Sequence, residues 1–170
     1  MGSVLAGGGP AVTEERCGGC GRAVEGGTEA CQARYEALLA RDYEDSAFFA
    51  VHRMFVDTYS LQHPDRYCRS AKSLAAHLVG LGLILEAGIP AASGAPALRA
   101  WLDGRRELEK PELPEARGEI TLGDVETISE PGPWRGAVRA WAVSTWQAYS
   151  GLHPLARSWA AEAGGQRRPG

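Results

Sequence analysis

The sequence predicts an all-α fold, a bundle of about four main helices with a small cysteine-containing loop, like a zinc knuckle, before the first. Apolar residues recur at helical spacing in several segments, and no strand-like alternation of apolar and polar residues persists. Capping residues, prolines and glycines bound those segments. A chain of 170 residues with 44% hydrophobic content suits one globular domain.

We expect this domain to cover residues 16–163. Residues 1–15 and 164–170 are predicted to be disordered tails, because they are rich in glycine and show no apolar period. The first predicted helix covers 29–45, with Thr28 as its N-cap and Cys31, Tyr35, Leu38 and Leu39 on one face.

The second predicted helix covers 46–63, capped by Asp45 or Ser46 and ended by Pro64. The third runs from a cap at Ser70 to Gly88 and is rich in leucine, which predicts deep burial.

A long connection follows at 89–119, with a short helix around "PALRAWLDG". The T-x-x-D spacing of "TLGDV" then predicts a capping box. The last helix covers 133–163, with a break near Gly151 and Pro154. Its core-facing positions follow helical spacing and are Trp134, Val138, Trp141, Thr145 and Leu152.

Charge and hydropathy bear on partners and location. The formal net charge is −3, and Lys and Arg are scattered, so we expect no nucleic-acid partner. The longest apolar run, "SLAAHLVGLGLILEAG", is interrupted by a histidine and too short for a bilayer, so we expect no membrane partner. The opening "MGSVLAGGGPAV" lacks the charged and apolar regions of a signal peptide, which favours a cytoplasmic protein.

Cys17 and Cys20 form a C-x-x-C pair in the glycine-rich "CGGCG". Two thiolates at this spacing around a tight turn supply half of a tetrahedral zinc site. A redox pair is an alternative, but that use is typical of a helix N-terminus after a strand. Inert thiols are a further alternative. We favour zinc as the cofactor.

A zinc site needs two more ligands. Cys31 lies in the first turn of the first helix and can fold back over the loop, although an ordinary buried thiol is the alternative. The fourth ligand is His63 or Cys68, which flank the turn after the second helix. We choose Cys17, Cys20, Cys31 and His63 as the metal ligands.

The segment "VHRMFVDTYSLQH" carries His52, Asp57, Tyr59 and His63. His52 and His63 share a helix face with Tyr59 between them. Asp57 lies four residues after Arg53, so an ordinary ion pair is one interpretation.

Two further histidines lie on other helices. His77 lies among leucines, where a hydrogen-bonded core histidine is the ordinary outcome, and His153 suits a role at a helix end. The alternative is a pocket inside the bundle, lined by His77, Asp57, His153 and Tyr59, that performs acid–base or metal chemistry.

The segments "CGGCG", "VHRMFVDTYSLQHPD", "AAHLVGLGLILEAG", "TLGDV" and "VRAWAVSTWQAYSGLHPLARSW", in this order, resemble an uncharacterised bacterial family catalogued as domain of unknown function 5946. The resemblance runs from about Cys17 to Trp159. It implies that the first two cysteines, Asp57 and the four histidines belong to recurring motifs, and it implies no activity. Cys68, the start of the third helix at Ala71–Lys72, and Pro154 after His153 depart from the family pattern.

Three functional hypotheses follow. The first is a zinc-binding helical protein whose bundle pocket acts on a neutral or cationic small-molecule substrate. The second is a non-catalytic interaction or regulatory module with structural zinc, for which exposed aromatic residues or a homodimer through the last helix provide the interface. The third is a thiol redox sensor that uses Cys17 and Cys20.

Overall fold

The computed structural model describes residues 15–165. Within this range the elements are helical, apart from one isolated antiparallel bridge between Arg16 and Ala23, so the all-α prediction is confirmed. The elements in chain order are α1 (Gly27–Glu44), α2 (Ser46–Phe49), α3 (His52–Gln62), α4 (Pro64–Tyr67), α5 (Ala71–Leu85), α6 (Ala91–Asp103), α7 (Leu122–Val125), α8 (Pro131–Ala148), a 3-10 turn (Ser150–Leu152) and α9 (His153–Gly165). Most of the two predicted tails, 1–15 and 164–170, lies outside the described residues.

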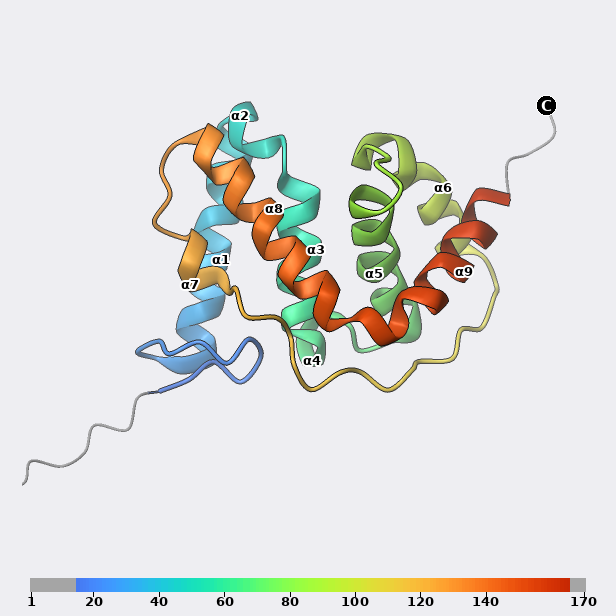
Figure 1. Ribbon diagram of the computed structural model, residues 1–170, viewed down its shortest axis with the longest axis horizontal. Helices are drawn as coiled ribbons and strands as arrows, with labels where there is room; N and C mark the ends of the chain where they lie inside the picture. The colour runs from blue at the N-terminus through green and yellow to red at the C-terminus, as the bar shows by residue number, and fades with distance from the viewer. Residues whose placement is uncertain (1–14, 166–170) are drawn as a thin grey trace, which may run out of the picture.

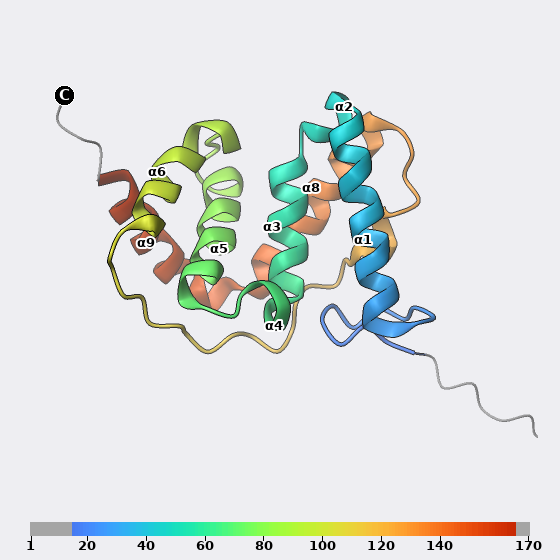
Figure 2. The same ribbon diagram turned by 180° about the vertical axis from the view of Figure 1, so that it is seen from behind.

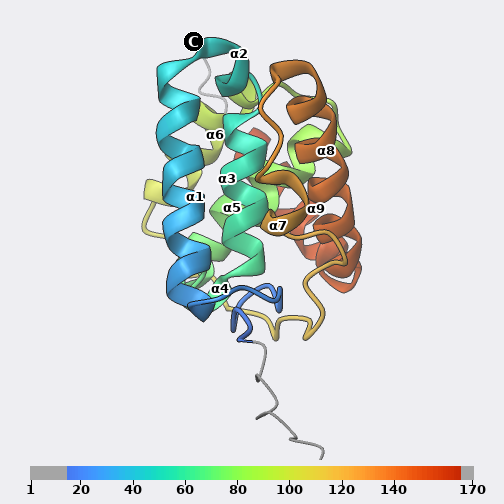
Figure 3. The ribbon, with the colours of Figure 1, turned by 90° about the vertical axis from the view of Figure 1, so that its left-hand side faces the viewer.

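The helices form two groups. One holds α1, α3 and α8, with α3 between the other two (Figure 3). The other holds α5, α6 and α9, and it stands beside the first group in views from the front and the back (Figures 1 and 2). The two groups meet mainly where α3 packs against α5, while α6 and α9 pack on the other sides of α5. This arrangement makes α5 the central helix, in agreement with its leucine-rich sequence.

Large aromatic side chains fill the core of the first group. Trp134 and Trp141 of α8 are buried against Phe55 of α3, with ring centroids 5.4 and 5.8 Å from it. Val138 and Thr145 are also buried and Leu152 is half-buried. The apolar face predicted for the closing helix therefore does face the core.

Three local features differ from the sequence-based expectation. The helix expected over 46–63 is broken at Ala50 and Val51, and this break lets Phe48 pack near Trp134 while the ring of Phe49 stacks on His52. The first helix is capped by Gly26 instead of Thr28. The short helix in the long connection begins at Ala91 and contains Pro96.

Other expected boundaries are present. Ser70 and Thr121 begin capping boxes, and the last helix is interrupted between Ala148 and His153. Among the described residues, no helix combines the length and apolar character that crossing a bilayer would require. The glycine-rich loop with the first two cysteines lies against the start of α1, close to α4 (Figure 1). This places it where α3 ends.

Candidate metal centre

The loop that carries the first two cysteines is a tight turn held by backbone hydrogen bonds. The amide of Cys17 donates to the carbonyl of Arg22, and the amide of Gly21 donates to the carbonyl of Cys17, both at 2.9 Å. Gly21 has a φ of 75°, a left-handed conformation that glycine adopts without strain. The amide of Gly18 also donates to Oγ1 of Thr28 at 2.8 Å, which ties the turn to α1. Thr28 therefore holds the cysteine loop.

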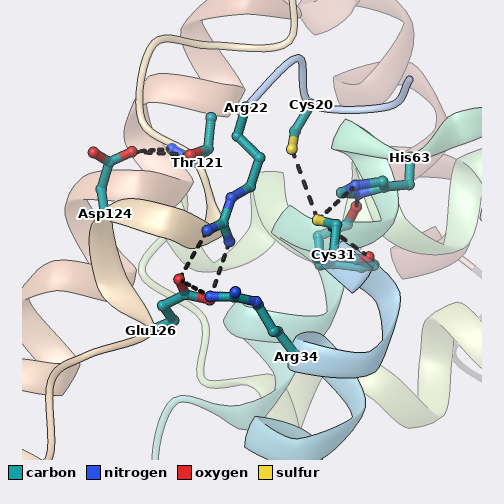
Figure 4. Close-up of polar contacts among 9 residues, drawn as sticks. Cys20, Arg22, Cys31, Arg34, His63, Thr121, Asp124 and Glu126 are labelled. Carbon is teal, nitrogen blue, oxygen red and sulfur yellow. Dashed lines mark hydrogen bonds and ion pairs between the residues drawn. The ribbon is translucent and has the colours of Figure 1, made fainter. Parts of the chain in front are cut away.

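The turn presents its two cysteines to Cys31 of α1 and His63 at the end of α3. The ligand atoms of Cys17, Cys20, Cys31 and His63 all lie within 4.8 Å of one another. Nε2 of His63 lies 3.3 Å from the sulfur of Cys17 and 3.7 Å from that of Cys31. The sulfurs of Cys20 and Cys31 lie 3.9 Å apart (Figure 4). These four side chains could bind one metal ion.

The imidazole of His63 is oriented by α3 itself. Its Nδ1–H donates to the carbonyl of Tyr59 at 2.8 Å, so Nε2 is the nitrogen that faces the cysteines. The ring of Tyr59 stacks on the imidazole with centroids 3.8 Å apart. A Cβ on Gly19 would lie 2.3 Å from Cδ2 of the ring, so the loop can approach the imidazole this closely only with glycine there. The histidine is therefore held in one ligating orientation.

The buried thiols influence one another's protonation. The hydrogen bond with Cys20, with a further contribution from His63, lowers the pKa of Cys31 to about 4. The same hydrogen bond and burial raise the pKa of Cys20. The pair therefore favours a thiolate on Cys31, which is the form that ligates a metal.

An ion-pair network anchors the cysteine loop to α7. Arg22 donates two hydrogen bonds to Glu126, at 3.0 and 2.8 Å, and Arg34 of α1 adds a third at 2.8 Å (Figure 4). The side chains of Arg22 and Glu126 are only 10% and 14% exposed. Burial acts to raise the pKa of Glu126, but the arginines outweigh it and the pKa is lowered. No sequence pattern indicated this pair, because 104 residues separate its partners.

Cys68, the other candidate for the fourth ligand, is not in this cluster. Its thiol is buried and donates to the carbonyl of Ser60 at 3.6 Å. Burial raises its pKa to about 12, so the thiol stays protonated near neutral pH. Cys68 is an ordinary core cysteine.

Asp57 and His77 meet between α3 and α5. Nδ1 of His77 donates to Oδ1 of Asp57 at 2.8 Å, and Nε of Arg53 donates to Oδ2 at 2.7 Å. Asp57 is fully buried, while the His77 side chain is 18% exposed. Among the described residues, Nε2 of His77 has no hydrogen-bond partner. Asp57 therefore forms the ion pair with Arg53 and also contacts His77.

The four residues predicted to line one pocket do not converge. Tyr59 lies at the cysteine cluster, where its hydroxyl is 3.8 Å from the sulfur of Cys31. His153 stacks on Trp146, which approaches Gly82, whereas Asp57 approaches Gly80. Gly80 and Gly82 are two residues apart, so they lie on nearly opposite sides of α5. The helix α5 therefore separates His153 from Asp57. Of the four residues predicted to line the pocket, only Asp57 and His77 contact each other.

His52 lies at the far end of α3 from the cysteine cluster. Its Nδ1 is 3.3 Å from the buried carboxylate of Asp42 on α1. His52 and His63 both contact residues of α1, Asp42 and Cys31, as their shared helix face predicts. No local sequence motif marks Asp42, nor Glu86, which contacts His153, nor Arg157, which pairs with Glu86, so these residues could not be predicted from the sequence.

A family model described as "Family of unknown function (DUF5946)" matches residues 15–150. The match includes the cysteine cluster, Asp57 and His77, and it ends before His153. No curated protein and no solved structure matches the chain.

Proposed function

Because the chain belongs to the DUF5946 family, whose function is unknown, we propose a function from its own geometry: a zinc-binding helical protein whose Cys3His centre is structural. The observation that carries the proposal is the spacing of the four ligand atoms, which lie within 4.8 Å of one another. Zinc bonds of about 2.3 Å to sulfur and 2.0 Å to nitrogen put tetrahedral ligands about 3.5–3.8 Å apart. The sulfur–nitrogen separations of 3.3 and 3.7 Å and the sulfur–sulfur separation of 3.9 Å lie within about 0.2 Å of those values.

The chemistry of the ligands supports zinc over magnesium and calcium. Three thiols and one imidazole are soft or borderline donors, which zinc prefers, whereas magnesium and calcium prefer oxygen. The hydrogen bond from Nδ1 of His63 to the carbonyl of Tyr59 is the outer contact usual for a metal-bound histidine. The lowered pKa of Cys31 supports the thiolate form.

A structural role follows from the number of ligands. Four protein side chains complete a tetrahedron and leave no open position for water or substrate. The ligands come from the cysteine loop, the start of α1 and the end of α3, so a bound ion would join these three segments. Cys17 and Cys31 are also buried, which keeps a substrate away from the ion.

Elemental analysis of protein purified without chelators tests the proposal. We expect one zinc per chain in the wild type, and its loss in Cys17→Ser and Cys31→Ser. Cys68→Ser is the matched control, because it replaces a buried cysteine outside the cluster. A wild type that neither contains nor takes up zinc would refute the proposal, and so would full zinc content in Cys17→Ser.

A second candidate function is acid–base catalysis by His77, as in the enzyme hypothesis. A buried carboxylate holds Nδ1 of the imidazole at 2.8 Å, and within residues 15–165 Nε2 has no partner. This is the arrangement of a general base oriented by an aspartate. The arrangement is equally compatible with a module in which the contact only joins α3 to α5.

His77→Gln separates these two interpretations once a reaction has been found by substrate screening. For a catalytic His77, we expect turnover to fall at least a hundredfold with little change in melting temperature. Activity retained in this variant would leave His77 with a structural role.

The redox hypothesis has its own test. Oxidation of Cys17 and Cys20 to a disulfide by peroxide, which is reduced to water, would consume two thiols and release the ion. A sensor should release zinc at low peroxide and take it up again after reduction. Zinc that stays bound under these conditions would exclude the sensor.

A further inference from the structure

A small apolar pocket lies between α5, α8 and α9, away from the cysteine cluster. Its volume is about 130 Å³, close to the ~150 Å³ of an engineered core cavity that holds benzene. The walls are Val79, Gly82 and Leu83 of α5, Trp146 of α8, and Ala156 and Ala160 of α9. The pocket therefore has room for one compact apolar group.

The indole that forms one wall is held firmly. His153 stacks on Trp146 with ring centroids 4.0 Å apart, and its Nε2 donates to the carbonyl of Trp146 at 2.9 Å. A Cβ on Gly82 would lie 2.8 Å from the indole, so α5 can approach it only with glycine there. Contacts from α5 and α9 thus hold the indole of α8 in place.

Glu86 and Arg157 stand at the mouth of the pocket. The carboxylate of Glu86 accepts two hydrogen bonds from Arg157, both at 2.8 Å, and one from the indole Nε1–H of Trp146 at 3.3 Å. Nδ1 of His153 lies 3.7 Å from the same carboxylate. The acceptor capacity of Glu86 is therefore largely used within the protein.

At the mouth of the pocket, the guanidinium of Arg157 still has N–H groups that, within the described residues, are free to donate hydrogen bonds. Arg157 employs Nε and one terminal nitrogen toward Glu86, and its other terminal nitrogen has no partner among residues 15–165. Its side chain is 61% exposed, so this nitrogen is accessible from solvent. A free guanidinium edge beside an apolar pocket fits an anionic head group, and a carboxylate suits it best.

We propose that this pocket binds a small organic acid, whose apolar body lies against Trp146 and whose carboxylate is bound by Arg157. The pocket depends on Ala156, Arg157 and Ala160 of α9, which lie beyond the residues matched by the family model. This site is separate from the zinc centre and from His77.

Three probes that share one ring and differ in charge test the proposal: benzoate, benzyl alcohol and benzylamine. Binding is followed by NMR through the indole Nε1–H signal of Trp146. We expect benzoate to bind at least threefold more tightly than benzyl alcohol, and benzylamine to bind most weakly. Tighter binding of benzylamine than of benzoate would overturn the proposal, as would no change of the signal with any probe.

Three variants identify the contacts. Arg157→Gln should weaken benzoate at least fivefold and leave benzyl alcohol unchanged, whereas Glu86→Gln should strengthen benzoate by removing a like charge. Ala160→Leu should abolish binding of both probes, because it fills the pocket from a half-buried position. Arg99→Gln is the control, since that arginine is 86% exposed on α6. Benzoate binding that is unchanged in Arg157→Gln or Ala160→Leu would refute the site.

Discussion

A Cβ atom on Gly80 would lie 2.6 Å from Oδ2 of Asp57, so α5 reaches the buried carboxylate of α3 only because residue 80 is glycine. The same Cβ would lie 2.9 Å from a terminal nitrogen of Arg53. The close approach lets His77 and Arg53 share one carboxylate across the main contact between the two groups of helices.

Gly80→Ala should therefore destabilise the protein. The added methyl group must displace the buried carboxylate of Asp57 and the partly exposed guanidinium of Arg53, and overpacking of this kind costs about 1–3 kcal/mol. Urea unfolding followed by circular dichroism measures the change. Gly136→Ala on α8 is the matched control, because its Cβ would meet nothing within 4 Å. We expect that variant to gain up to about 1 kcal/mol from helix propensity, and equal effects of the two variants would contradict the explanation.

Removal of the zinc ion proposed for the Cys3His cluster should lower the melting temperature. An ion at about a thousand times its dissociation constant contributes about 4 kcal/mol, which corresponds to roughly 10 °C for a domain of this size. Calorimetry with and without EDTA measures the difference. Cys17→Ser should melt like the chelated wild type and should not respond to EDTA. An unchanged melting temperature in the chelated wild type would contradict a structural ion.

Tyr59→Phe should weaken zinc binding by up to about tenfold. The tyrosine hydroxyl donates to the sulfur of Cys31 at 3.8 Å, and loss of such outer contacts commonly reduces metal affinity. Competition with a chromophoric chelator measures the affinity. Tyr35→Phe is the control, since Tyr35 stacks on Tyr59 with centroids 3.8 Å apart and makes no hydrogen bond to the cluster. Equal affinity in Tyr59→Phe and the wild type would show that the hydroxyl has no such role.

Asp42→Asn should stabilise the protein at neutral pH. Asp42 is fully buried, and its Oδ1 has no partner in the part of the chain that the structure describes. Burial raises its pKa, an effect that the hydrogen bond from His52 only partly offsets. A raised pKa means that the carboxyl's contribution to stability is full below its ordinary pKa of 3.8 and is lost as the pH rises through the folded value. The variant avoids this loss.

Urea midpoints of the wild type and Asp42→Asn, measured from pH 7 down to pH 4, test this sign. The difference should be largest at pH 7, on the order of 1 kcal/mol, and should shrink as the pH falls. A variant that is less stable than the wild type at pH 7 would show that the contact with His52 outweighs the cost of burying the charge.

Local patterns were sufficient for the main helices, apart from the break at Ala50 and Val51, and for half of the candidate metal centre. Helical spacing of leucine and tryptophan predicted α5 and α8, because the side that a helix buries depends on residues three and four apart. The pairing of Arg53 with Asp57 follows from the same spacing, and the C-x-x-C turn brings Cys17 and Cys20 together within a few residues.

Packing between distant segments decided the rest. Choosing His63 over Cys68 as the fourth ligand depends on how α3 ends against the cysteine loop, since both residues lie near that turn in the sequence. Placing His77 on Asp57 required α5 to approach α3 at Gly80, and placing His153 on Trp146 required the approach at Gly82. Side-chain periodicity shows which residues face inward, but only the packed helices show which inward residues meet.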